Sequence, residues 1–165
     1  MVNSLKFLLS ATLLMLLSLT VQSQIIAPPK WDIKFTDQEL TVGEESSITF
    51  KAQIPRNWYI YSNDFEDVGP IQISLKLEDS IGIVRKGELV AINPKTKFDD
   101  VWDNEVKYFD KEGNFIQNFL ISSKDIKIAG FISYQMCSDV SGQCIPFEED
   151  FTLTAIVAGK KKSRD

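Results

Sequence analysis

The residues best suited to carry out chemistry are two cysteines, Cys137 and Cys144, the only cysteines in the 165-residue chain. Between them lies a polar segment that contains Ser141 and Gly142, a combination typical of a turn. We therefore expect the two cysteines to lie at the two feet of a hairpin loop. In an oxidising compartment, a pair placed in this way forms a disulfide.

Such a disulfide could have two different roles, and the residues alone leave both open. As a structural bond it closes a short ring, which stabilises the fold by about 2–2.5 kcal/mol on chain-entropy grounds. As a redox centre it accepts electrons from a partner's thiolate and later passes them to a partner's disulfide. The spacing is not Cys-x-x-Cys, and the nearby Asp139 has the wrong charge to activate a thiol. A redox role would therefore be passive and would depend on specific docking.

The sequence contains no histidine, and this narrows the other chemical possibilities. Histidine is the usual general base, the usual partner of a nucleophile and a very common metal ligand. We therefore do not expect a hydrolase of the serine or papain type, or a zinc site. The acidic stretch 64–67 lacks the pattern of a calcium-binding loop. The sequence predicts neither a metal nor a cofactor.

The charge of the chain argues against nucleic acid as a partner. Its formal net charge is −5, and several of its basic residues lie in the last segment, 159–165. A protein this acidic lacks the basic face that phosphate binding requires. We expect the segment 159–165 to be a solvated basic tail, with contact to an anionic surface as the alternative.

The first 23 residues predict a cleaved signal peptide. Lys6 precedes the apolar run 7–19, which is shorter than the roughly 20 residues of a membrane-spanning helix. Small residues follow, so that cleavage before Gln24 is expected, with a retained N-terminal anchor as the alternative. The mature domain would then span residues 24–158 and reside in the periplasm or outside the cell.

Alternation of apolar and polar residues with a period of two runs through most of the mature chain. This period indicates strands with one buried face. Strands are expected at 31–35, 47–54, 58–61, 71–77, 106–109, 115–121, 126–136 and 151–157. No segment shows a sustained helical stripe. The pattern favours an all-β protein, a single immunoglobulin-like antiparallel β-sandwich that is monomeric.

Four sequence features follow one another in a recognisable order. They are Trp58-Tyr59-Ile60-Tyr61-Ser62, Val68-Gly69-Pro70-Ile71, Trp102 with Val106-Lys107-Tyr108-Phe109, and Cys137 with Cys144-Ile145-Pro146. In this order, over residues 31–157, they resemble the N-terminal periplasmic domain of the thiol:disulfide interchange protein DsbD, here in a stand-alone form. The resemblance implies an immunoglobulin-like domain with one redox-active disulfide, formed by Cys137 and Cys144.

The resemblance also implies a role for residues around the disulfide. Tyr59 and Tyr61 match the aromatic residues beside it, and the loop 98–105 matches a cap with Trp102 as the covering residue. Asp99 and Asp100 lie in this cap, where they could raise the pKa of a thiol or steer partners. For all of these residues, a place in the ordinary core, rim or solvated surface of a sandwich is the alternative.

Two hypotheses for function follow. The first is a periplasmic thiol–disulfide exchange domain that relays electrons to thioredoxin-fold partners, such as disulfide isomerases and the thioredoxin of cytochrome c maturation. A separately encoded membrane protein of the DsbD type would be a further partner and the source of electrons. The second is a secreted immunoglobulin-like binding or assembly module in which the disulfide is purely structural.

Overall fold

The structure is a computed structural model that describes residues 26–66 and 69–157. The expected signal peptide (1–23) and the expected basic tail (159–165) lie outside the described residues. Nowhere in the described ranges is there a helix long and apolar enough to cross a membrane.

The described residues form ten strands and no helix. The strands are β1 (Lys30–Phe35), β2 (Glu45–Gln53), β3 (Trp58–Tyr61), β4 (Ser74–Ile81), β5 (Ile83–Ala91), β6 (Lys95–Asp99), β7 (Asn104–Asp110), β8 (Glu112–Ile121), β9 (Asp125–Ser138) and β10 (Cys144–Ile156). All pairings between them are antiparallel.

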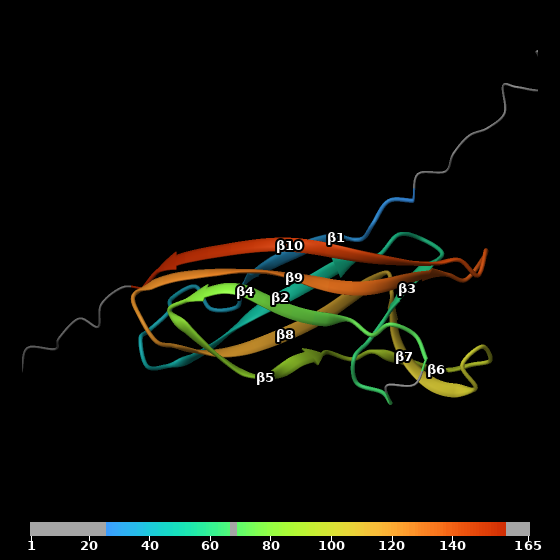
Figure 1. Cartoon of the computed structure of the whole chain (residues 1–165), viewed down its shortest axis with the longest axis horizontal. Coiled ribbons are helices and arrows are strands. Elements are labelled where there is room, and N and C mark those ends of the chain that lie inside the picture. The colour runs from blue at the N-terminus through green and yellow to red at the C-terminus, as the bar shows by residue number, and fades with distance from the viewer. Residues whose placement is uncertain (1–25, 67–68, 158–165) are drawn as a thin grey trace, which may run out of the picture.

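The strands form two sheets that pack face to face as an elongated sandwich (Figure 1). In the described part of the chain, sheet 1 has the order β1-β2-β8-β5, and sheet 2 has the order β10-β9-β3-β7-β6 with β4 also paired to β9. The hairpin of β9 and β10 runs along most of the long axis of the molecule (Figure 1). The expected immunoglobulin-like antiparallel sandwich is confirmed.

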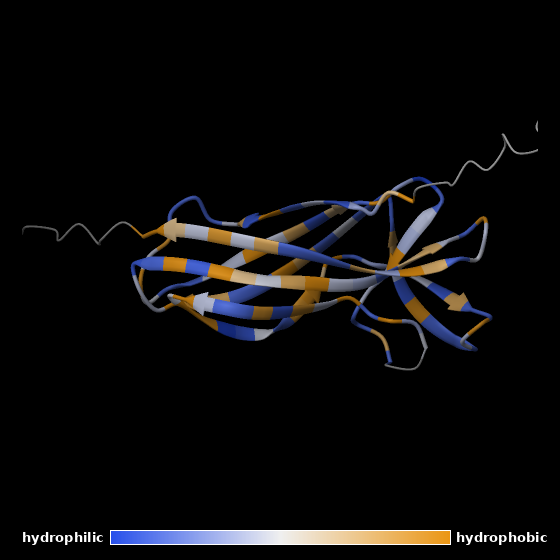
Figure 2. Cartoon of the chain, turned by 45° about the horizontal axis from the view of Figure 1, so that its top comes forward, coloured by the Kyte–Doolittle hydropathy of each residue, from blue (hydrophilic) through white to orange (hydrophobic). Residues whose placement is uncertain are grey.

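The main core lies between the two sheets and is built by the alternation that the sequence predicts. On β2, for example, Ile48, Phe50 and Ala52 are at most 1% exposed, while the residues between them face outward. The same alternation appears as bands of contrasting hydropathy along the strands in Figure 2. Each large apolar side chain buried in this way contributes about 1.5–3 kcal/mol. The largest fully buried core side chains include Phe115, Phe119, Ile60, Ile132, Tyr134 and Met136.

Some strand boundaries differ from those expected. β5 and β6 were not predicted, β4 begins at Ser74 instead of residue 71, and β10 begins at Cys144 instead of residue 151. Residue 71 lies outside β4, and its backbone amide donates to the side chain of Gln135 instead. The expected loop 98–105 is correspondingly short, because β6 extends to Asp99 and β7 starts at Asn104. Only residues 100–103 form the turn between them.

Candidate redox site

Cys137 and Cys144 form a disulfide at the end of the β9–β10 hairpin. The two residues lie directly opposite each other, with a Cα–Cα distance of 4.1 Å, and they form the final pair of a ladder that extends to Asp125 and Ile156. The expected position at the feet of a hairpin loop is therefore confirmed. The loop lies at one extreme of the long axis, at the same end of the molecule as the β6–β7 turn (Figure 1).

The loop between the cysteines is held by its own hydrogen bonds. The hydroxyl of Ser138, a residue that sequence analysis did not single out, accepts from the amides of Val140 and Ser141 at 3.2 and 3.1 Å. The amide of Ser138 donates to the carbonyl of Gln143 at 2.9 Å, and Gly142 supplies the positive φ of 66° that the turn requires. Serine hydroxyls commonly bond nearby backbone in this way. The disulfide therefore sits on an ordered support.

The two halves of the disulfide differ in exposure. Cys137 is only 1% exposed, whereas Cys144 is exposed to solvent. The difference follows from the sheet order, since β9 lies between β10 and β3, while β10 is an edge strand of sheet 2. Cys144 is therefore the half of the disulfide that is open to a large reagent, and Cys137 is the half that is covered.

The buried half of the disulfide belongs to a second hydrophobic cluster, which is separate from the main core. This outer cluster consists of Tyr59, Tyr61, Val106 and Cys137, with Phe65 and Tyr108 packed against it. Its members lie on the face of sheet 2 that points away from the main core, because their chain neighbours, such as Ile60 and Met136, lie in the core. Tyr59 pairs directly with Cys137 between β3 and β9.

Hydrogen bonds join the tyrosines of the outer cluster to the β6–β7 turn. The hydroxyls of Tyr59 and Tyr61 lie 3.2 Å apart, and Tyr61 donates to Oδ2 of Asp99 at 3.1 Å. The residue Asp99 is 8% exposed, and its other carboxylate oxygen, Oδ1, accepts a hydrogen bond from the amide of Val101 at 3.1 Å. Burial above all, together with the bond to Tyr59 and the nearby Asp99, raises the pKa of Tyr61 far above its usual value. Tyr61 therefore stays neutral and acts as a donor at physiological pH.

A lysine that sequence analysis missed completes the outer cluster. The Nζ atom of Lys97 lies 3.7 Å from the ring centroid of Tyr59 and 5.0 Å from that of Tyr108. Oδ2 of Asp99 is 4.0 Å from the same nitrogen. Lys97 reaches this position because β6 pairs with β7, which sets Lys97 opposite Val106. An ammonium over an aromatic face is a favourable cation–π arrangement.

The tip of the β6–β7 turn is exposed and partly apolar. Phe98, Val101 and Trp102 are 62%, 82% and 44% exposed, and Asp100 faces solvent. The indole of Trp102 lies against Gly69, where an added Cβ would meet its Cγ at 2.9 Å. The structure thus brings Tyr59, Tyr61 and Asp99 together with Cys137. Trp102 instead contacts the loop between β3 and β4.

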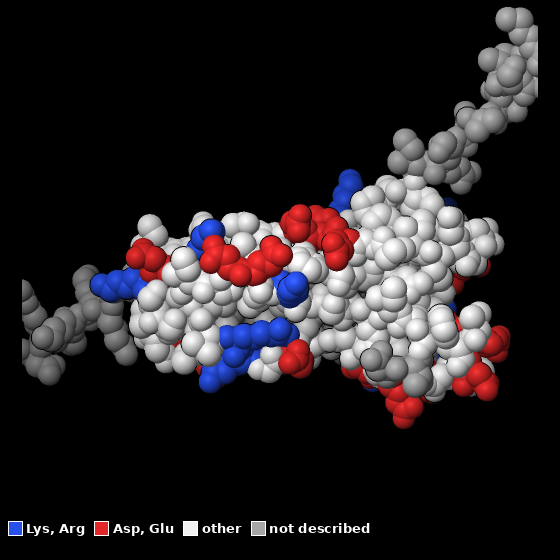
Figure 3. Space-filling view, in the orientation of Figure 1, with Lys and Arg blue, Asp and Glu red and all other residues white. Residues whose placement is uncertain are grey.

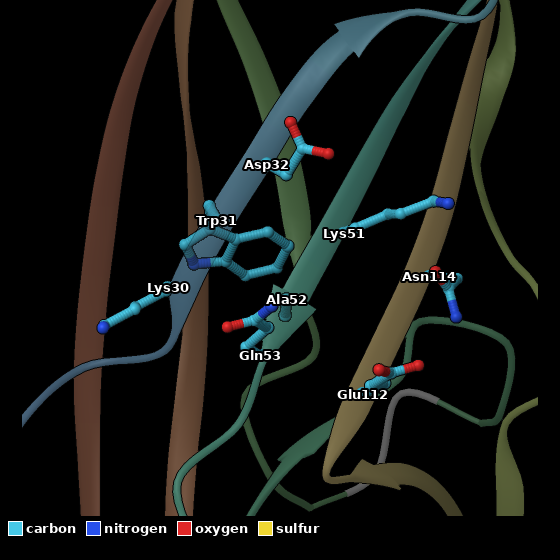
Figure 4. Close-up of a pocket in the computed structure, with 8 residues that line it drawn as sticks. All are labelled: Lys30, Trp31, Asp32, Lys51, Ala52, Gln53, Glu112 and Asn114. Carbon is cyan, nitrogen blue, oxygen red and sulfur yellow. The ribbon is translucent and has the colours of Figure 1, made fainter.

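A shallow pocket on sheet 1 carries no comparable arrangement. Figure 4 shows the side chains of three neighbouring strands that line it, and neither cysteine is among them. Its lining consists of Lys30, Trp31, Asp32, Lys51, Ala52, Gln53, Glu112 and Asn114. Among the described residues, no group of three or more potential ligands is placed to hold a metal ion.

The fold and the site together define a class of protein. It is an immunoglobulin-like sandwich with a single disulfide at the end of an edge hairpin, one sulfur exposed and the other buried beneath aromatic rings. The chain belongs to the family of the N-terminal domain of the thiol:disulfide interchange protein DsbD, whose sequence pattern matches residues 22–156. The resemblance stated from sequence is therefore confirmed.

The structure is also similar to the N-terminal domain of Neisseria meningitidis DsbD, crystallised in the reduced form. The sequences are 14% identical, the match covers 76% of this chain and 86% of that chain, and the TM-score is 0.50. This likeness shows that the fold is shared. No curated protein sequence matches the chain.

Family membership and the Cys137–Cys144 disulfide support thiol–disulfide exchange as the activity of the site. Domains of this family are periplasmic and interact with thioredoxin-like proteins.

Proposed function

We propose that this chain is a periplasmic electron relay in which the Cys137–Cys144 disulfide accepts two electrons from one thioredoxin-fold protein and delivers them to another. The observation that carries the proposal is the unequal exposure of the two cysteines, with Cys144 open and Cys137 1% exposed. A disulfide whose only task is structural does not need one sulfur open to a protein-sized reagent.

The exposure also assigns an order to the exchange steps. A thiolate of the donor attacks Sγ of Cys144, a mixed disulfide forms, and the electron pair of the broken bond stays on Sγ of Cys137 as a thiolate. The second donor thiolate then attacks the donor's own sulfur in the mixed disulfide and releases Cys144 as a thiolate. The donor leaves oxidised, this chain is left reduced, and solvent supplies the protons that the two thiolates take up. Reaction with an acceptor disulfide runs through the same steps in reverse.

The β6–β7 turn is proposed as a cap that restricts access to this site, with Trp102 and Asp100 at its tip and Asp99 at its base. Asp99 supports this assignment because it bonds both to the turn and to Tyr61 beneath it. The apolar exposure of the tip suits a segment that is covered when a partner docks. On the face shown in Figure 3, the upper part of this end of the molecule carries few charged side chains, whereas acidic side chains lie along its lower edge.

The partners that fit this role are thioredoxin-fold proteins of the periplasm. A membrane protein of the DsbD type, with a thioredoxin-like domain, is the proposed electron source. Disulfide isomerases and the thioredoxin of cytochrome c maturation are the proposed acceptors. Export would depend on the N-terminal segment 1–23, with cleavage before Gln24.

The reduction potential of the Cys137–Cys144 pair tests the proposal directly. The purified mature domain is equilibrated with glutathione or dithiothreitol buffers, and the reduced fraction is measured. We expect a potential between about −270 and −180 mV, the range spanned by thioredoxin and protein disulfide isomerase. A value below about −300 mV, typical of structural disulfides, would favour the binding-module function instead.

The assigned order of attack has its own test. Cys137→Ser leaves the exposed thiol of Cys144, and this variant should form a stable mixed disulfide with a thioredoxin-fold partner that lacks its resolving cysteine. The matched variant Cys144→Ser leaves only the buried thiol of Cys137 and should trap little or no partner. Equal trapping by both variants, seen on non-reducing gels, would contradict the assigned order.

A further inference from the structure

The reaction just described leaves a negative charge in an unusual place. When the disulfide opens at Cys144, the electron pair resides on Sγ of Cys137, which is buried within the outer cluster. A thiolate in an apolar environment is disfavoured unless a positive charge or a donor lies nearby. The ease of the exchange therefore depends on which groups face this sulfur.

Glu148, Asp150 and Lys76 share this face of sheet 2 but lie farther along β9, beside residues 131 and 133. The charged or titratable groups in or beside the outer cluster come from four strands. In the described residues they are Tyr59 and Tyr61 from β3, Lys95, Lys97 and Asp99 from β6, Tyr108 and Asp110 from β7, and Cys144 from β10. Lys95 is engaged with Asp110, and its side chain is 55% exposed. The ammonium of Lys97, with a side chain only 27% exposed, is therefore the cation best placed to act on the cluster.

The ammonium of Lys97 is coupled to Cys137 through the ring of Tyr59. It lies 3.7 Å from the centroid of that ring, and Tyr59 is the direct cross-strand neighbour of Cys137. Directly paired residues have Cβ atoms about 5 Å apart, so the ring that the ammonium contacts belongs to the side chain next to Cys137. Little water lies between them, because Tyr59 is 7% exposed and Cys137 is 1% exposed. Charges at this separation interact appreciably where solvent is excluded.

We propose that Lys97 is a positioning residue that stabilises the Cys137 thiolate across the ring of Tyr59. The inference rests on the proposed exchange function and extends it to a residue outside the cysteine pair and the turn tip. Asp99, 4.0 Å from the ammonium, holds Lys97 over the rings while the disulfide is closed. When the thiolate forms, the same ammonium has a second anion to stabilise without moving out of the cluster.

The proposal is tested by titrating Cys137 alone. In a Cys144→Ser background Cys137 is the only thiol, so the thiolate absorbance near 240 nm reports it at pH values below those at which tyrosines ionise. The measurement needs no redox partner. We expect Lys97→Met to move the titration midpoint upward by about one pH unit, because removal of a nearby cation disfavours the charged form. Lys97→Arg keeps the charge and should restore the midpoint.

Lys107→Met is the matched control. Lys107 lies next to Val106 on β7 but projects from the opposite face of the sheet, where it pairs with Asp64 at 2.7 Å. The Lys107→Met substitution removes the same unit of charge and should leave the titration midpoint of the Cys137 thiol unchanged. An equal movement in Lys107→Met, or no movement in Lys97→Met, overturns the proposal. Circular dichroism of each variant establishes that it is folded, and Lys97→Gln serves as a second neutral variant if Lys97→Met is not.

The outcome is independent of the exchange function. If the titration behaves as expected but the wild-type disulfide has a potential below about −300 mV, the proposed relay fails and the role of Lys97 stands. If the potential is in the exchange range and Lys97→Met leaves the midpoint unchanged, the relay stands and the role of Lys97 fails.

Discussion

The two faces of sheet 2 near the disulfide are built from alternate residues of the same strands, yet their chemistry differs. On the inner face, Ile60 and Met136 are fully buried and carry no group that hydrogen-bonds strongly. On the outer face, one residue along each strand, Tyr59 and Cys137 join a cluster with two bonded hydroxyls, a carboxylate and an ammonium. The inner face stabilises the fold, and the outer face surrounds the reactive bond with polar groups that can respond to it.

The largest expected effect belongs to the outer face. Cys144→Ser should abolish electron transfer to any thioredoxin-fold partner, because the one other cysteine of the sequence, Cys137, is buried. Loss of the disulfide should lower the free energy of unfolding by only about 2 kcal/mol, since the ring it closes is short. Partner reduction assays and urea unfolding measure the two quantities. Residual transfer in this variant would show that Cys137 is reachable after all.

A substitution on the inner face should instead lower stability strongly and leave the redox chemistry nearly unchanged. Ile60→Ala removes a fully buried side chain and should lower the free energy of unfolding by about 2–5 kcal/mol. The reduction potential of the folded variant should stay within about 15 mV of the wild-type value, which corresponds to less than 1 kcal/mol for a two-electron couple. Urea unfolding and redox equilibration check the pair of results. A large change in potential would mean that the two faces are not separate in function.

A smaller effect should come from the hydrogen bonds that join the cluster to the turn. Tyr61→Phe removes the hydroxyl that bonds Tyr59 and Asp99, and should cost about 1–2 kcal/mol of stability. If the turn is a cap, loss of the hydrogen bond between Tyr61 and Asp99 should also allow dithiothreitol to reduce the disulfide faster. Tyr108→Phe is the control, because Tyr108 packs against the same cluster but takes no part in the hydrogen bonds of Tyr61 with Tyr59 and Asp99. Unchanged kinetics in Tyr61→Phe would argue against the cap.

The smallest effect concerns the ion pair of Asp64 and Lys107, on the opposite face of the sheet from the outer cluster. Burial raises the pKa of Asp64, but the hydrogen bonds from Lys107 and Ser62 outweigh burial, so the pKa lies below its usual value. A lowered pKa stabilises the fold above about pH 4, and this contribution is lost as the pH falls through the pKa of the folded state. Because both side chains are more than a third exposed, we expect about 0.5 kcal/mol or less. Asp64→Asn should remove this part of the pH dependence in acid unfolding.

The parts of the fold that sequence could predict are those with one strictly buried face. Residues 126–136 alternate without interruption and proved to be most of β9. β5 and β6 were not predicted because they are edge strands with exposed lysines, and the pairing of β5 is also interrupted by an irregularity between Lys86 and Val90. Edge strands carry such charges because one of their sides has no neighbour, and in a sequence they look like loops.

The residues of the site also divide into those that the sequence could reveal and those that only strand pairing could reveal. The cysteine pair was visible from residue type and spacing, and the two tyrosines came from the family resemblance. Lys97 could not be found, because only the pairing of β6 with β7 carries it to the ring of Tyr59, and β6 itself was not predicted. Asp99 was named for its charge, but its bond to Tyr61 depends on the same pairing.

The disulfide closes the outermost rung of a ladder in which the next twelve pairs, from Met136 and Ile145 to Asp125 and Ile156, have no covalent link between the strands. Opening it therefore changes the covalent connectivity of the chain while leaving every other rung in register. Each turnover then demands almost no reorganisation of the scaffold, and the domain can cycle between its two oxidation states without refolding.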